Sequence, residues 1–201
     1  MMNAENFLVA IHRIDQANAA DPRRAMADGT DWPHELLYAM RMTAWLERLY
    51  PDASEPLRLA VRAQHIRRWM IPRDSYPMDR AGYLRWRADL AKFHAEQADQ
   101  ILRDVGYDDA TSARVQSLLR KENLKADADT QALEDVAALV FLQFELSDFA
   151  KKHAGQDEKL VRILQRTWKK MSPRGRQAAT ELELGREERR LFEMAIQSDA
   201  S

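Results

Sequence analysis

The chain has 201 residues, of which 45% are hydrophobic and 31% charged, and its formal net charge is −1. This apolar content can build a core, so a wholly disordered chain is excluded. The absence of cysteine excludes disulfides, thiolate metal sites and a cysteine nucleophile. With no signal peptide and no transmembrane run of apolar residues in the sequence, we expect a cytoplasmic protein, formed by a single domain over residues 1–201 and without a membrane partner.

Apolar residues recur at helical spacing along most of the chain, and short segments with proline or glycine separate the periodic stretches. The predicted helices cover, in chain order, residues 4–18, 34–50, 55–70, 79–104, 109–122, 130–152, 157–171 and 174–184. Ser54 is a plausible N-cap for the third of them. The charged tail 186–201 is expected to be helical to about residue 198 and to pack loosely. Because no stretch alternates with the period of a strand, the predicted fold class is all-α, a single-domain bundle of about eight helices.

Four ionisable side chains fall on the apolar stripes of four different predicted helices, and they are Glu35, His65, His94 and Asp135. A buried carboxylate or imidazole needs a partner, because its desolvation without compensation costs several kcal/mol. Imidazole and carboxylate oxygen together suit Mn, Fe or Zn, and carboxylate with water suits Mg. These four residues are therefore candidate ligands of a divalent metal. The alternative is a set of hydrogen-bonded core residues with no chemical role.

The order and spacing of these residues resemble the HD-domain superfamily of metal-dependent phosphohydrolases. In that helical bundle a His, then a His-Asp pair, further His residues and a late Asp hold the metal. His65, His94 and Asp135 match these positions. Ile66 stands where the Asp of the pair is expected, and Glu35 or Tyr38 stands where the first His is expected. The resemblance covers about residues 33–145 and implies an HD-like bundle with a degenerate metal site.

A second resemblance extends over almost the whole chain. The segments IDQANAADP, ELLYAMRMTAWLERLYPDASE, AQHIRRWMIPRDSYPMDRAGYLRWR, LLRKENLKADADTQALEDVA and TWKKMSP are similar to the bacterial and fungal family called domain of unknown function 4202. These motifs are long and specific. The resemblance names a family and implies no activity.

Positive charge is concentrated between Arg58 and Arg87, where eight arginines stand against two aspartates in a chain that is nearly neutral. Arginine forks bind phosphate in a bidentate manner. We expect Arg58, Arg62 and Arg68 to bind phosphate, because the first two precede His65 on its own predicted helix face. A solvated helix face, with arginines paired to acidic neighbours, is the alternative.

Together these observations predict a metal-assisted phosphohydrolase, or a degenerate relative that only binds a phosphorylated small molecule or nucleotide. In the active version the metal activates a water molecule and Glu134 acts as general base. The alternative class is a non-enzymatic RNA-binding or protein-interaction module that uses the same arginines and interleaved aromatic residues as an open surface.

Overall fold

A computed structural model of the chain describes residues 4–197. Within them the fold is predominantly helical, as predicted, and two short strands form a hairpin. The helices and strands are α1 (Ala4–Ala19), β1 (Arg24–Ala27), β2 (Thr30–Pro33), α2 (His34–Leu49), α3 (Glu55–Ala63), α4 (Arg80–Val105), α5 (Asp109–Leu119), α6 (Ala128–Val140), α7 (Leu146–Lys152), α8 (Asp157–Lys170), α9 (Pro173–Thr180) and α10 (Arg186–Gln197). None of these helices is both long and apolar enough to cross a bilayer.

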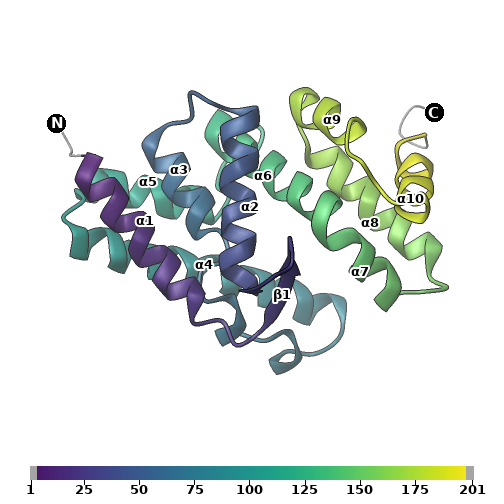
Figure 1. The fold of residues 1–201 in the computed structure, drawn as a ribbon, viewed down its shortest axis with the longest axis horizontal. Coiled ribbons are helices and arrows are strands. Elements are labelled where there is room, and N and C mark those ends of the chain that lie inside the picture. The colour runs from purple at the N-terminus through teal and green to yellow at the C-terminus, as the bar shows by residue number, and fades with distance from the viewer. Residues whose placement is uncertain (1–3, 198–201) are drawn as a thin grey trace. The chain divides into compact units, whose positions relative to one another are not determined.

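The backbone contacts divide the chain into two compact units, the first ending at Leu133 and the second beginning at Glu134, inside α6. In the first unit α3 is the central helix, and it packs against α1, α2, α4 and α5 (Figure 1). The reason lies in its sequence, EPLRLAVRA, in which the buried positions cover more than half of the helix circumference and the polar side chains Glu55, Arg58 and Arg62 share the remaining side. In the second unit α10 packs against both α7 and α8.

Capping residues explain several helix boundaries. The Ser54 side chain accepts a hydrogen bond from the Leu57 amide, which confirms Ser54 as the N-cap of α3. Asp79 caps α4 in the same way, and Gly106 ends α4 with a φ of 93° that suits glycine. These local signals are encoded within a few residues of each boundary, so the sequence locates most helices correctly.

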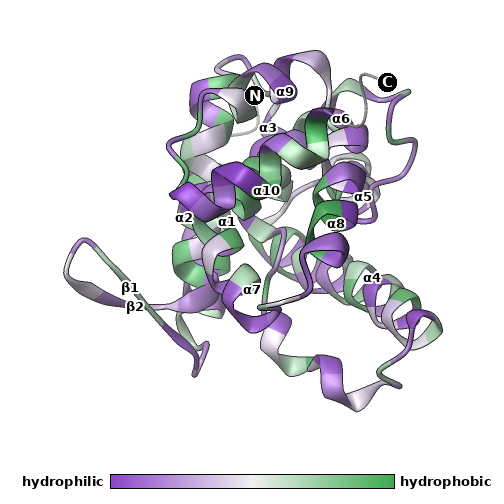
Figure 2. Ribbon diagram, turned by 90° about the vertical axis from the view of Figure 1, so that its right-hand side faces the viewer, coloured by the Kyte–Doolittle hydropathy of each residue, from purple (hydrophilic) through white to green (hydrophobic). Residues whose placement is uncertain are grey.

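The hairpin of β1 and β2 is absent from the sequence prediction. Asp28 and Gly29 form its turn with positive φ angles of 49° and 74°, the pattern of a two-residue hairpin loop. The strands pair antiparallel, with Arg24 opposite Pro33. Figure 2 shows the hairpin projecting away from the helices of its own unit. Each strand has only four residues and neither has a buried position, so the sequence shows no alternation of core-facing apolar and polar residues that would identify strands.

Helix α3 ends at Ala63, whereas the periodicity predicted a helix to about residue 70. After Ala63 the amides of Gln64 and Ile66 donate to carbonyls three residues earlier, and Arg67 then adopts the left-handed conformation, with φ 52°. The Asn18 side chain at the end of α1 accepts the Arg67 amide at 3.2 Å and holds this turn. His65 therefore lies in the turn that follows α3 and not on the helix face that was predicted for it.

The long helix predicted over 130–152 forms as α6 and α7, joined by a π-helical segment, Phe141–Glu145. The charged C-terminal segment differs from the loose packing expected for it. Helix α10 buries Leu191, Phe192 and Ala195, and it packs on α8. Residues 198–201 of the predicted tail lie outside the described residues.

Candidate functional site

Glu35 stands in the first turn of α2 and is 1% exposed. One oxygen of its carboxylate, Oε1, accepts a hydrogen bond from the Arg23 guanidinium at 2.5 Å. The same guanidinium nitrogen donates to Asp21 at 2.9 Å, and Asp21 also accepts the Glu35 amide at 3.1 Å. Asp21 thus supplies the cap that Pro33, which precedes α2, cannot supply. Burial of the Glu35 charge is offset by an arginine from the loop after α1.

His65 lies beside Glu35, its Nδ1 3.5 Å from the second carboxylate oxygen, Oε2. Its ring stacks on Tyr38 of α2, with the centroids 4.2 Å apart and the planes 15° from parallel. Its other nitrogen, Nε2, is 3.1 Å from the Arg68 guanidinium. Because a guanidinium can only donate, Nε2 is the acceptor and the ring proton belongs on Nδ1, facing Glu35. The imidazole is therefore fixed between a carboxylate and a cation.

His94 of α4 completes the group, with its ring centroid 5.8 Å from that of His65. His94 Nε2 and Glu35 Oε2 are among the buried polar atoms that have no hydrogen-bond partner within the described residues. Such unsatisfied buried atoms are uncommon and costly in folded proteins. They mark a place where a polar ligand or a water molecule would be stabilised.

The pKa shifts of these groups follow from their surroundings. Burial, followed by the charge of Arg68, lowers the pKa of His65 to about 4, against the opposing effect of Glu35. Burial also holds the pKa of His94 well below its ordinary value, and His65 and Arg68 add to the effect. Burial alone would raise the pKa of Glu35, but contacts with His34 and His65 and the charge of Arg23 hold it well below its usual range. Near neutral pH the site therefore has two neutral imidazoles and one carboxylate.

Positive charge predominates around the two imidazoles. Arg68 lies with its guanidinium 4.9 Å from the Trp86 ring centroid, which orients it. The charges of Arg87 and Lys121 contribute to the lowered pKa values of His94 and His65 respectively. Among the described residues of this region, the four cations Arg23, Arg68, Arg87 and Lys121 therefore outnumber the two buried carboxylates, those of Asp21 and Glu35. The local field favours an anion.

Two of the predicted phosphate-binding arginines have partners within the fold. Arg58 donates to the backbone carbonyls of Ala53 and Pro51 at 3.0 and 2.9 Å. Arg62 forms a bidentate pair with Asp15 at 2.6 and 2.7 Å, and it also donates to Thr43 at 3.1 Å. Arg58 thus stabilises the loop before α3, and Arg62 connects α3 to α1 and α2. Of the three predicted arginines, Arg68 is the one that the structure brings to His65.

Asp135 and Glu134 belong to the second unit. The buried Asp135 carboxylate accepts hydrogen bonds from the Ser172 amide, at 2.8 Å, and from the Ser172 hydroxyl. It thereby supports the start of α9, where Ser172 is the N-cap. Glu134, the predicted general base, has a carboxylate oxygen 3.5 Å from Nζ of Lys170. These contacts give both acidic residues a structural role within their own unit.

The donor atoms suit a metal poorly in their present arrangement. Among residues 4–197, the group with ligand atoms within 4.8 Å of one another consists of Asp21, His34 and Glu35, and it shares only Glu35 with the predicted ligands. The Arg23 guanidinium occupies the Asp21 and Glu35 oxygens, and Arg68 occupies His65 Nε2. A metal held by Asp21, His34 and Glu35 would compete with Arg23, and one held through His65 Nε2 would compete with Arg68.

Sequence reasoning missed the Asp21–Arg23–Glu35 contact. Asp21 and Arg23 lie between the predicted helices 4–18 and 34–50, and neither they nor His34 were among the candidate site residues. The side chain of His34 is 28% exposed, and its Nδ1 is 3.6 Å from Glu35. A signal was present in Glu35 itself, since a carboxylate on an apolar stripe requires a cation nearby. The position of Glu35 in the sequence does not show which cation pairs with it.

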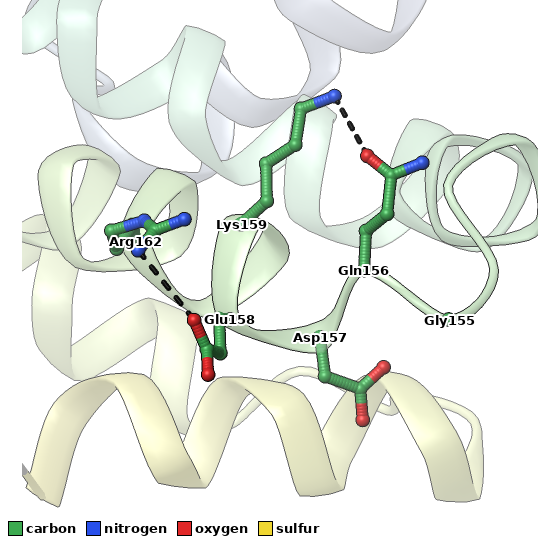
Figure 3. A pocket seen from close by; sticks show the side chains of 6 residues that line it. All are labelled: Gly155, Gln156, Asp157, Glu158, Lys159 and Arg162. Carbon is green, nitrogen blue, oxygen red and sulfur yellow. Dashed lines mark hydrogen bonds and ion pairs between the residues drawn. The ribbon is translucent and has the colours of Figure 1, made fainter.

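A surface hollow lies elsewhere, in the second unit, where α8 begins. Figure 3 shows the residues around it: Gly155, Gln156, Asp157, Glu158, Lys159 and Arg162. Lys159 donates to Gln156 at 3.0 Å, and Arg162 pairs with Glu158 at 3.8 Å. The hollow is open and has no buried titratable group, so it is not an enzyme-like pocket.

Comparison with known proteins gives a family and no activity. No match was found among curated proteins or among solved structures. A family model described as Domain of unknown function (DUF4202) matches residues 9–192, nearly the whole chain. The long motifs and this match agree, and the chain belongs to the DUF4202 family.

Proposed function

We propose that the first unit binds a phosphorylated small molecule, such as a nucleotide, through its phosphate group at Arg68 and His65. The observation that carries this proposal is the Arg68 guanidinium 3.1 Å from a neutral imidazole, beside the buried, unpartnered Nε2 of His94. Phosphate oxygens accept charge-assisted hydrogen bonds from a guanidinium. The surrounding cations neutralise the ligand, and Glu35 keeps the His65 ring oriented.

Binding without a metal is the preferred form of the proposal, because guanidinium groups occupy two of the coordinating positions. Metal-assisted hydrolysis is the second candidate, and the two unsatisfied buried atoms favour it. Calorimetry with Mn, Fe, Zn and Mg separates the two: metal affinity that disappears in Glu35→Gln supports the hydrolase, and no uptake of any of the four supports the binder.

Titration calorimetry and thermal shift with inorganic phosphate, pyrophosphate and nucleotides test the proposal. Arg68→Gln should weaken binding at least about tenfold, since one charge-assisted hydrogen bond contributes about 1.5–3 kcal/mol. Arg87 is exposed, so Arg87→Gln removes one positive charge near the two imidazoles without disturbing the contact between Arg68 and Trp86.

Arg85→Gln is the matched control, because Arg85 is an exposed arginine on α4, two residues before Arg87. It should leave phosphate affinity unchanged. Equal affinities in the Arg68, Arg87 and Arg85 variants would contradict the proposal, as would the absence of phosphate binding by the wild-type protein at millimolar concentration.

A further inference from the structure

Helix α8 of the second unit carries a row of cations that the proposed phosphate site does not use. Residues 159–176 contain seven Lys and Arg and no acidic residue, in a chain whose net charge is −1. Five of the seven lie on α8 and are exposed: Lys159, Arg162, Arg166, Lys169 and Lys170. We call these five side chains the α8 cationic face.

Helix geometry places the five cations together. At 100° per residue they fall within an arc of about 100°, and they span about 16 Å along the axis. The opposite side of the helix carries Leu160 and Leu164, each 2% exposed, which pack in the second unit. One side of α8 therefore anchors the helix and the other side presents a straight cationic row.

Among the described residues, carboxylates neutralise little of the charge at the first three positions of the row, Lys159, Arg162 and Arg166. Glu158 reaches Arg162 only at 3.8 Å, and both side chains are largely exposed, so the pair is weak. Asp157 and Glu187 both pair with Arg190 of α10 instead. Figure 3 shows the Lys159 side chain extending away from the carboxylates of Asp157 and Glu158. At the other end of the row, Glu134 lies 3.5 Å from Lys170.

We infer that the α8 cationic face binds the phosphate backbone of a nucleic acid. A nucleic acid carries one phosphate charge per nucleotide along each strand, and a row of cations about 16 Å long can contact several of these phosphates. Guanidinium forks suit phosphate oxygens. An anionic membrane fits less well, because a helix that lies in a membrane interface inserts apolar side chains. Leu160 and Leu164 of α8 are already buried, and none of the exposed large apolar side chains among residues 4–197 lies on this helix.

The test is fluorescence anisotropy of the full chain with a labelled 20-nucleotide RNA and a labelled 20-base-pair DNA, repeated over a range of salt concentrations. The variant Lys159→Gln/Arg162→Gln/Arg166→Gln should lose at least about tenfold in affinity. The slope of log affinity against log salt should become shallower by about two to three, because each lost phosphate contact contributes about 0.7–0.9. Whichever probe shows the steeper slope identifies the preferred form of nucleic acid.

The matched control, Arg13→Gln/Arg48→Gln/Lys92→Gln, removes the same number and kind of exposed charges from the first unit. It should retain at least half of the wild-type affinity. Circular dichroism establishes that both variants are folded. Arg68→Gln should bind the nucleic acids normally while losing inorganic phosphate, which separates this inference from the proposed function. Equal losses in the two triple variants, or binding to phosphatidylserine vesicles or polyglutamate with no binding to either nucleic acid, would overturn it.

Discussion

Arg62 and Arg68 lie six residues apart, yet their guanidinium groups have different neighbours. Arg62 is held by Asp15 in a bidentate pair, while Arg68 rests on Trp86 and contacts the neutral ring of His65. A guanidinium whose fork is already filled by a carboxylate has little capacity for a phosphate. The neighbours of each guanidinium therefore distinguish Arg62, which stabilises the fold, from Arg68, which is available to a ligand.

Replacing Arg62 with alanine should accordingly destabilise the protein without changing phosphate affinity. The side chains of Arg62 and Asp15 are 13% and 27% exposed, so the pair is largely shielded from solvent. We expect Arg62→Ala to reduce the free energy of unfolding by about 1–3 kcal/mol, measured by urea denaturation. An unchanged denaturation midpoint would show that the Asp15 pair contributes nothing. Arg24→Ala, whose pair with Asp31 is exposed, should change stability by less than about 1 kcal/mol.

The neutral state of His65 predicts a loss of stability in mild acid. Burial and Arg68 lower the pKa of His65 from 6.5 to about 4 in the folded protein, so between these values the unfolded chain binds the additional proton. The free energy of unfolding should therefore fall as pH decreases from about 6.5 towards 4, with a contribution of at most about 1.4 kcal/mol per pH unit. Urea denaturation at several pH values measures the slope.

In His65→Gln this part of the slope should be missing, whatever the absolute stability of the variant. His12→Gln, at an exposed position of α1, should keep the wild-type slope. If His65→Gln and the wild-type protein show parallel pH profiles, the imidazole is not held neutral by its surroundings.

At the scale of elements, α9 depends on a contact with a different helix. Its N-cap, Ser172, is itself held by Asp135 of α6, and Gly175 in the first turn lies against the same carboxylate. A methyl group on Gly175 would be 2.6 Å from the Asp135 Cγ atom. Because Asp135 is fixed by its two hydrogen bonds, it cannot move aside without losing one of them.

Gly175→Ala should therefore destabilise the protein by about 1–3 kcal/mol, even though alanine is a better helix former than glycine. Thermal unfolding followed by circular dichroism measures the change. Gln177→Ala, at an exposed position of the same helix, should be nearly neutral. A stabilising effect of Gly175→Ala would mean that helix propensity outweighs the close approach.

For the molecule as a whole, local signals predicted the helices and failed where distant residues meet. Ser54 and Gly106 mark boundaries within their own turns, so the sequence identifies them. The left-handed turn at Arg67, which follows α3, is held by Asn18, which lies 49 residues away and accepts the Arg67 amide. No periodicity contains that information, and His65 was placed on a helix as a result. The same limit applies to the candidate site: an apolar stripe reveals that Asp135 is buried, but not that Ser172 is its partner.

The base of the hairpin has a further consequence. The Asp21 and Arg23 contacts with Glu35, and the His34 amide bonded to the Arg23 carbonyl at 2.9 Å, close the chain before and after residues 24–33. The tip at Asp28 and Gly29 can therefore change length without loosening α2, since the closing contacts lie below it. Exposed tips of this kind accept inserted sequence. A short peptide tag or a fluorophore could therefore be placed at the tip without replacing the side chain of Arg23 or Glu35.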